Sequence, residues 1–116
     1  MVILHCLTAE KWNNEKQKPF YGYDSIVKYG FIHCSSIENF WRVAPHFIDT
    51  EEKLILLCID TENVKSEIKW EDHDNCGRKY PHIYGELNTD AVINSFPFQK
   101  DSNGEFILNK EIKKYQ

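Results

Sequence analysis

Apolar runs separated by turn-forming residues predict two pairs of strands and helices in the first third of the chain. Residues 2–7 favour a strand and are too few for a helix, and Thr8 follows them as a candidate N-cap. A second short helix is expected to begin near Asp24 and to end at Gly30. Residues 31–35 then resume the strand pattern. The predicted order is therefore strand, helix, helix and strand.

The next segment has the period of an amphipathic helix. Ser36 suits the N-cap position of this helix. Its apolar positions recur at intervals of three and four residues, at Ile37, Phe40, Trp41 and Ala44. Pro45 would end or kink it. The spacing predicts a helix that packs one face on the core.

Strand patterns dominate the second half of the chain. Residues 54–59 form a continuous apolar run that is typical of a central strand covered on both faces. Residues 68–72 and 81–85 have shorter strand patterns, and the turn-forming sequence 101–104 separates two apolar runs. That turn predicts a C-terminal hairpin within residues 96–110.

The order of these elements predicts the fold class. Because helices concentrate in the first half and strands in the second, we expect α+β rather than a doubly wound α/β fold. A chain of 116 residues has the size of one domain and buries roughly two-thirds of its unfolded surface. With 41% apolar and 28% charged residues, the composition is ordinary for a folded protein. Residues 1–116 are therefore expected to form a single domain.

Charge and hydropathy argue against two classes of partner. The net charge is −4 and no basic run extends beyond Lys113-Lys114, so we expect no nucleic-acid partner. No apolar stretch reaches about 20 residues and no basic region precedes the first apolar run, so we expect no membrane partner and a cytoplasmic protein. The four cysteines are widely spaced, and without a secretion signal they are expected to be free thiols, most of them buried.

Two strand-like segments carry the same His-Cys pair. Residues 3–6 read Ile-Leu-His-Cys and residues 31–34 read Phe-Ile-His-Cys. Because side chains alternate along a strand, each histidine points away from the cysteine beside it. His5 and His33 would share a face if the two strands are neighbours. A functional role in a site and a structural role on a sheet are equal alternatives for these two histidines.

Two hydroxyl groups follow the second histidine. Ser35 and Ser36 stand where the strand gives way to the predicted helix, whose N-terminus favours an anion such as phosphate. A phosphate-bearing ligand is therefore one hypothesis for this position. The alternative is that Ser36 only caps the helix and Ser35 only fills the turn.

Acidic candidates lie farther along the chain. Glu71 ends a predicted strand, and a carboxylate in that position can steady an oxocarbenium-like sugar or orient a nucleophile. We prefer Glu71 as the catalytic carboxylate, and Glu86 is the competing candidate. The alternative is that the acids around Glu71, with Asp72 and Asp74 beside it, are solvated surface groups.

A third histidine stands in the sequence Pro-His-Ile-Tyr-Gly at residues 81–85. His82 and Tyr84 can wall a pocket and stack on a flat ring. A purely structural hydrogen-bonding role for His82 is an equal alternative. Neither a Gly-x-Gly-x-x-Gly nor a Gly-x-x-x-x-Gly-Lys motif is present, so Rossmann and P-loop mechanisms have no support.

The strings Gly-Phe-Ile-His-Cys-Ser at 30–35, Lys-Trp-Glu at 69–71 and Pro-His-Ile-Tyr-Gly at 81–85 resemble the domain of unknown function 952 family. The resemblance covers about residues 2–95. It implies a divergent branch of the ADP-ribosyltransferase-like fold, in which two small sheets surround a cleft that holds NAD. The family's own reaction is not established, so an enzymatic activity is an expectation of the fold alone.

The resemblance also implies roles for individual residues. His5 would contact the nicotinamide ribose, His33 with Ser35 would line the nicotinamide site, and Glu71 or Glu86 would steady the sugar as nicotinamide leaves. The catalytic set is then Glu71, His5 and His33. The residues expected to bind the cofactor are His5, Thr8, His33, Ser35, Ser36, His82 and Tyr84.

Three functions follow as hypotheses. The leading one is a transferase or glycohydrolase that binds NAD or an ADP-ribose-like nucleotide and needs no metal. The second is a metal site formed by His5, His33 and His82 with a carboxylate. The third is a non-catalytic module for a ligand or peptide, read by aromatic side chains around a cleft. Those aromatic residues are Trp12, Tyr21, Tyr23 and Tyr84.

Overall fold

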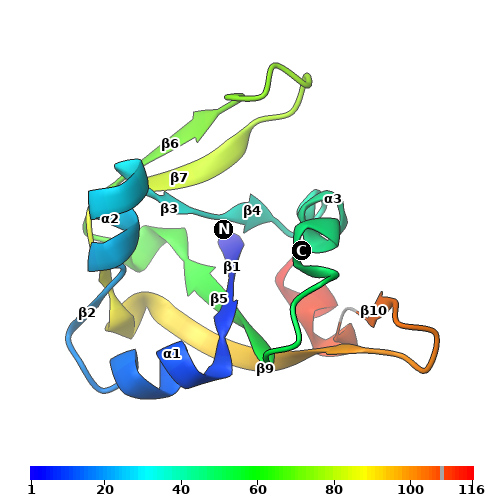
Figure 1. Ribbon diagram of the computed structural model, residues 1–116. Coiled ribbons are helices and arrows are strands. Elements are labelled where there is room, and N and C mark those ends of the chain that lie inside the picture. Colours follow the sequence, from blue (N-terminus) through cyan, green and yellow to red (C-terminus); the bar gives the residue numbers. More distant parts are fainter. Residues whose placement is uncertain (108) are drawn as a thin grey trace.

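A five-stranded antiparallel sheet forms the centre of the molecule in the computed structural model, which describes residues 1–107 and 109–116 (Figure 1). The strand order is β10-β9-β5-β1-β4. The strands are β1 (Val2–Thr8), β4 (Ser35–Ser36), β5 (Leu54–Asp60), β9 (Val92–Lys100) and β10 (Phe106–Ile107). The apolar run of β5 lies in the middle of this sheet, with its side chains buried on both faces. The prediction of a central strand is therefore confirmed.

Two smaller antiparallel sheets complete the β structure. One has the order β3-β7-β6 and the other pairs β2 with β8. Their strands are β2 (Phe20–Tyr21), β3 (Ile32–His33), β6 (Glu67–Glu71), β7 (Tyr80–Tyr84) and β8 (Leu87–Asn88). The β6–β7 hairpin projects away from the five-stranded sheet at the top of Figure 1. Its register sets His82 opposite Lys69 on one side and opposite His33 on the other.

Three short α-helices occupy the first half of the chain. They are α1 (Ala9–Glu15), α2 (Tyr23–Tyr29) and α3 (Phe40–Val43). Short 3-10 helices follow at η1 (Ala44–Phe47), η2 (Thr61–Asn63), η3 (Thr89–Ala91) and η4 (Lys110–Tyr115). No helix in the described part of the chain is long and apolar enough to cross a membrane.

Local signals correctly predicted the start of α1 and the end of α2. The Oγ1 of Thr8 accepts a hydrogen bond from the backbone N–H of Lys11, as its prediction as the α1 cap requires. Gly30 ends α2 in the left-handed conformation, with φ of 87°, which glycine adopts at little cost. The predicted cap of α2 at Asp24 was wrong, because the N-cap is Gly22 in the left-handed conformation and Asp24 lies in the first turn of the helix.

The core lies on both faces of the five-stranded sheet. On one face, odd-numbered side chains of β1 and β5 pack against the three-stranded sheet, α1 and the β2–β8 pair. This cluster includes Ile3, Leu7, Trp12, Ile32, Leu57, Ile59, Ile83 and Leu87. On the other face, even-numbered side chains pack against α3 and η4, in a cluster that includes Leu4, Phe40, Leu56, Cys58, Phe98 and Ile112. The chain is thus a small single α+β domain, as predicted.

Residues 31–35 do not form one strand, contrary to the prediction. The chain leaves the three-stranded sheet after His33 and enters the five-stranded sheet at Ser35. Between them the backbone N–H of Cys34 donates to the carbonyl of Pro81 at 3.1 Å, and its side chain is buried in the core. This single residue carries the chain from one sheet to the other.

The helix predicted from Ser36 begins later and is shorter. Ser36 belongs to β4, and its Oγ accepts from the backbone N–H of Asn39 at 3.2 Å, so it caps a turn. The helix itself spans Phe40–Val43 before the chain tightens into η1. Trp41, which was expected on the apolar stripe, is 61% exposed, and its ring lies 4.3 Å from the Arg42 guanidinium carbon.

The C-terminal hairpin is confirmed for the described residues. Phe106 pairs with Lys100 and Ile107 pairs with Gln99, around a turn in which Asp101 accepts backbone hydrogen bonds from Asn103 and Glu105. Leu108, the last apolar residue of the predicted hairpin, lies outside the described residues.

Candidate functional site

His5 has both ring nitrogens occupied inside the core. Its Nδ1 lies 2.7 Å from the carbonyl oxygen of His33, and its Nε2 lies 2.9 Å from the hydroxyl of Tyr21. A carbonyl oxygen only accepts, so Nδ1 must carry the proton and Nε2 must accept from the Tyr21 hydroxyl. This fixes one neutral tautomer and leaves no ring nitrogen free.

Burial keeps this pair uncharged. His5 is 8% exposed, and desolvation lowers its pKa to about 4 against the bond to the His33 carbonyl, which acts to raise it. Burial also raises the pKa of Tyr21 well above its usual range, so its hydroxyl stays a donor. His5 therefore joins β1 to the start of the second sheet and to β2 as a structural group.

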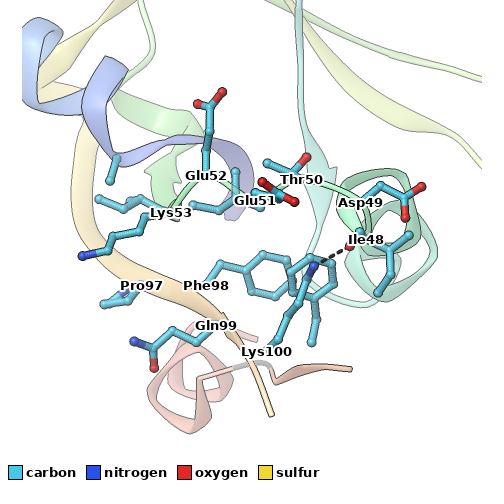
Figure 2. Close-up of a pocket in the computed structure, with 14 residues that line it drawn as sticks. Ile48, Asp49, Thr50, Glu51, Glu52, Lys53, Pro97, Phe98, Gln99 and Lys100 are labelled. Atoms are coloured by element: carbon cyan, nitrogen blue, oxygen red, sulfur yellow. Dashed lines mark hydrogen bonds between the residues drawn. The ribbon is translucent and has the colours of Figure 1, made fainter. Parts of the chain in front are cut away.

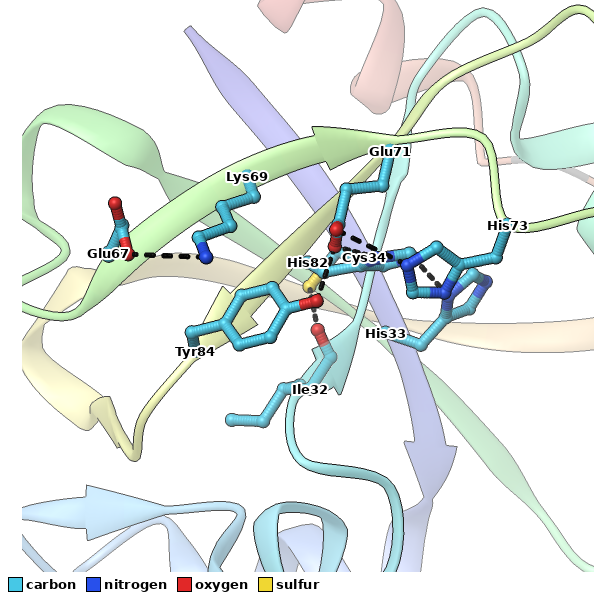
Figure 3. A network of polar contacts seen from close by, with 9 residues as sticks. All are labelled: Ile32, His33, Cys34, Glu67, Lys69, Glu71, His73, His82 and Tyr84. Atoms are coloured by element: carbon cyan, nitrogen blue, oxygen red, sulfur yellow. Dashed lines mark hydrogen bonds and ion pairs between the residues drawn. The ribbon is translucent and has the colours of Figure 1, made fainter.

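A second set of polar groups lies on the three-stranded sheet (Figure 3). Glu71, at the end of β6, accepts through Oε1 from the hydroxyl of Tyr84 at 2.5 Å and from Nδ1 of His82 at 3.0 Å. Its Oε2 lies 3.3 Å from Nε2 of His73. Two β7 side chains of alternate positions, His82 and Tyr84, thus meet one carboxylate of the neighbouring strand.

His82 continues this set toward His33. Its Nε2 lies 3.0 Å from Nδ1 of His33, the residue paired with it across β3 and β7 (Figure 3). Because an ionised carboxylate only accepts, Nδ1 of His82 donates to Glu71, and in the neutral ring Nε2 then accepts from Nδ1–H of His33. The Nε2 of His33 is left with a lone pair. It has no hydrogen-bond partner among residues 1–107 and 109–116.

The charges agree with this assignment. Hydrogen bonds from Tyr84 and then His82 lower the pKa of Glu71 to about 2, so it is a carboxylate at neutral pH. Partial burial, and then the nearby His82, lower the pKa of His33 to about 4. His82 is 2% exposed, whereas His33 reaches the surface. We call the series Glu71, His82 and His33 the imidazole relay.

Aromatic packing holds the relay in place. The ring of Phe31 stacks on that of His82 with centroids 4.2 Å apart and also contacts His73 and Tyr84. Neither Phe31 nor His73 was among the predicted site residues. Phe31 was detectable from strand alternation, because it precedes His33 by two residues and so points to the same side.

A small cavity lies between the two histidine strands, with a volume of ≈ 150 Å³. Its lining includes His5, His33 and Ser35 on the strand side and the rings of Tyr29, Phe40 and Phe47 on the helical side. The two histidine strands are not neighbours in a sheet, contrary to the condition set for a shared face. The histidines meet instead across this cavity, where the chain crosses between sheets.

The other predicted site residues lie in different surroundings. Ser35 is buried and its Oγ donates to the carbonyl of Ser36 at 2.8 Å, so both hydroxyls are engaged locally. Because α3 is a single turn that begins at Phe40, the anion site expected at a helix start beside Ser36 does not form. Thr8 lies at the far end of β1 as the cap of α1. Of the two candidate glutamates, Glu71 joins the histidines, whereas Glu86 follows β7 and accepts through its carbonyl from Ser66.

The metal set and the aromatic cleft of the sequence hypotheses are not assembled as expected. His5 lies apart from the carboxylate, and the structure instead groups Glu71, His73 and His82, with ligand atoms within 4.8 Å of one another. Trp12 and Tyr21 pack edge to face in the core, with centroids 6.2 Å apart. Tyr23 is 66% exposed on α2.

The cysteines beside the two strand histidines offer no activated nucleophile. Cys6, Cys34, Cys58 and Cys76 are all free thiols, as predicted, and only Cys76 is exposed. Burial raises the pKa of the Cys6 thiol to about 12 and moves that of Cys34 in the same direction. The cysteine beside each strand histidine is therefore a small core residue.

A larger cavity lies elsewhere, between the segment before β5 and the β9–β10 hairpin (Figure 2). Three acids, Asp49, Glu51 and Glu52, stand on its rim, and Lys100 donates across it to the carbonyl of Ile48. Its volume of ≈ 1140 Å³ describes an open groove. No histidine lines it, so this groove is separate from the cluster of histidines and Glu71.

Comparisons with known proteins agree with the sequence resemblance. The model of a family described as protein of unknown function, DUF952, matches residues 6–95. The crystal structure of protein CC0527 from Caulobacter crescentus superposes with a TM-score of 0.83 at 24% identity, covering 97% of this chain and 99% of that one. The solution NMR structure of CC0527 gives a TM-score of 0.73 at 26% identity over 89% of each chain. No curated protein matches the sequence.

Proposed function

The chain belongs to the DUF952 family, and from the site it carries we propose that it binds NAD or a related ADP-ribose nucleotide and cleaves or transfers at the nicotinamide ribose. The link to the ADP-ribosyltransferase-like fold is part of this proposal. The observation that carries it is the imidazole relay, which ends at a His33 ring nitrogen with no partner among the described residues, and His33 also lines a cavity of ≈ 150 Å³.

The cavity supports a flat heteroaromatic ring as the bound group. A single six-membered ring with an amide substituent fits a volume of this size, whereas a whole nucleotide does not. Tyr29, Phe40 and Phe47 supply apolar contact, and aromatic rings stack on such a group. The ribose and phosphates would then extend past His33 toward solvent.

The relay supports base catalysis at that point. The bond from C1′ of the ribose to the nicotinamide nitrogen breaks, and its electron pair leaves with nicotinamide, which neutralises the pyridinium. The oxygen of water, or of an acceptor hydroxyl, bonds to C1′ and gives its proton to Nε2 of His33. His33 then passes its Nδ1 proton to His82, whose positive charge lies 3.0 Å from the Glu71 carboxylate.

This mechanism changes the roles inferred from the resemblance. Glu71 acts as a positioning residue through His82, because its Oε1 already accepts from Tyr84 and His82 and its Oε2 faces His73. His33 takes the catalytic role. His5 shapes the cavity and has no free nitrogen for the ribose.

The test combines nucleotide binding with nicotinamide release. Titration calorimetry with NAD, ADP-ribose and nicotinamide measures binding, and chromatographic assay of nicotinamide measures turnover. We expect the wild type to bind NAD and release nicotinamide, and His33→Gln to lose about 10²- to 10⁴-fold in rate, the usual effect of removing a general base. Binding of NAD should change little.

Lys16→Gln is the control, since Lys16 is exposed at the C-terminal end of α1 and lies outside both the relay and the cavity lining. It should retain the wild-type rate. Absence of binding at millimolar NAD, ADP-ribose and nicotinamide would overturn the proposal. Binding without release would reduce it to a nucleotide-binding module, and full activity in His33→Gln would exclude the relay as the catalytic group.

A further inference from the structure

We propose that Glu71, His73 and His82 form a binding site for a divalent transition-metal ion, with Zn²⁺ as the fitting probe. The three side chains come from β6, the following loop and β7, and their ligand atoms all lie within 4.8 Å of one another. Metal binding here rests on this geometry alone and does not depend on the proposed nucleotide chemistry.

The distances suit a small tetrahedral ion. A Zn²⁺ ion with bonds of 2.0–2.1 Å sets its ligand atoms roughly 3.3–3.4 Å apart. The Nε2 of His73 lies 3.3 Å from Oε2 of Glu71, and the Nδ1 of His82 lies 3.0 Å from Oε1 of Glu71. Since the ligand atoms of all three residues lie within 4.8 Å of one another, side-chain adjustments of about 1 Å bring both rings and one Glu71 oxygen to this spacing. Two imidazoles and one carboxylate are also a ligand combination that zinc sites use.

Access and support are both present. The side chain of His73 is 47% exposed and that of Glu71 is 28% exposed, so an ion can enter from the loop side and keep a fourth, solvent position. Tyr84 donates to the Glu71 carboxylate, and the second nitrogen of His82 contacts His33. Such outer partners orient metal ligands.

An ion on Nδ1 of His82 would reverse the direction of the imidazole relay. His82 would then carry its proton on Nε2 and donate to Nδ1 of His33, which would move the proton of His33 to its outer nitrogen. Both rings stay neutral, so the change needs no net proton uptake or release. If the proposed function is correct, Zn²⁺ therefore removes the base from the site and inhibits it.

Calorimetric titration of tag-free protein with ZnCl₂ tests the site. We expect one ion per chain in the wild type, at least tenfold weaker binding in His73→Ala, and wild-type binding in His46→Ala. Thermal unfolding of each variant without metal checks that it is folded. Wild-type binding weaker than millimolar, unchanged affinity in His73→Ala, or the same loss in His46→Ala would each overturn the proposal.

A spectroscopic readout separates this site from the nucleotide proposal. In long-range ¹H–¹⁵N spectra, Zn²⁺ should shift both nitrogens of His82 and move the proton of His33 from Nδ1 to Nε2, while His5 stays unchanged. A shift confined to His73, or one at His5, would overturn the assignment. Failure of nicotinamide release would leave these readouts unaffected, and loss of zinc inhibition in His73→Ala, relative to its own metal-free rate, tests the two proposals together.

Discussion

Two histidines follow nearly the same sequence, yet the fold treats them in opposite ways. His5 and His33 each stand before a cysteine on a strand, and each has its proton on Nδ1 by the logic of its hydrogen bonds. His5 donates to a backbone carbonyl and accepts from Tyr21, so both nitrogens are used. His33 donates to His82, and its outer nitrogen has no partner in the part of the chain that the structure describes.

The difference comes from what surrounds each strand. β1 lies between β5 and β4 with core on both faces, whereas β3 is a two-residue edge strand beside a projecting hairpin. Because His5 is buried, its hydrogen bonds serve the structure. Because His33 lies on an edge strand, a ligand can reach it. A repeated motif in one chain therefore does not imply a repeated role.

The largest expected effect is on stability. His5→Ala leaves the Tyr21 hydroxyl and a buried carbonyl without partners and opens a cavity, which should cost about 3–5 kcal/mol in the free energy of unfolding. His33→Ala should cost about 1 kcal/mol or less, because water can reach the exposed position. Urea denaturation of both variants measures the contrast, and equal losses would remove it.

The pH dependence of stability should follow His5. Its folded pKa of about 4 lies below the ordinary value of 6.5, so the unfolded chain binds more protons between these values. The stability contributed by the neutral ring is present above pH 6.5 and is lost as the pH falls toward 4, by up to about 3 kcal/mol.

The measurement is urea denaturation of the wild type and His5→Ala at several pH values. Groups common to both proteins cancel in the difference, which should shrink as the pH falls from 6.5 to 4.5. A difference that stays constant over this range would show that His5 does not titrate as described.

An intermediate effect, on the rate of nicotinamide release, is expected for the residues around His33. Glu71→Gln removes the carboxylate that fixes the tautomer of His82, and loss of such an orienting partner typically costs 10- to 100-fold in activity. The rate of nicotinamide release should fall by that factor with little change in NAD binding. Glu86→Gln is the matched control, and an equal fall in that variant would contradict the choice of Glu71.

The smallest effect separates two tyrosines. Tyr21→Phe removes one hydrogen bond to the buried His5 and should cost about 1–2 kcal/mol in the free energy of unfolding. Tyr84→Phe removes the bond to Glu71 on the accessible sheet and should leave unfolding unchanged. Thermal and urea unfolding of the pair decide this, and a larger loss for Tyr84→Phe would reverse the distinction.

Local sequence signals predicted those parts of the fold that local physics controls. The apolar run of β5, the Thr8 cap, the Gly30 stop and the turn at residues 101–104 each depend on a few adjacent residues, and each was confirmed. The continuous strand at 31–35 was wrong because its break depends on a bond from Cys34 to Pro81, far along the chain.

The sequence predicted which residues form the candidate site better than it predicted the hydrogen bonds between them. His33, Glu71, His82 and Tyr84 were singled out by residue type and motif, and the structure brings all four together. Their order along hydrogen bonds depends on the register of β3, β7 and β6, which no local pattern sets. That both ring nitrogens of His5 are hydrogen-bonded could likewise be known only from the position of Tyr21.

The most direct measurement of the central claim is the tautomer of each histidine at neutral pH, read from long-range ¹H–¹⁵N spectra of metal-free protein. We predict the proton on Nδ1 for His5, His33 and His82, with Nε2 of His33 alone sensitive to added ligand and solvent exchange. A proton on Nε2 of His33 in the metal-free protein would contradict the relay, and with it the assignment of His33 as the reactive partner of the two.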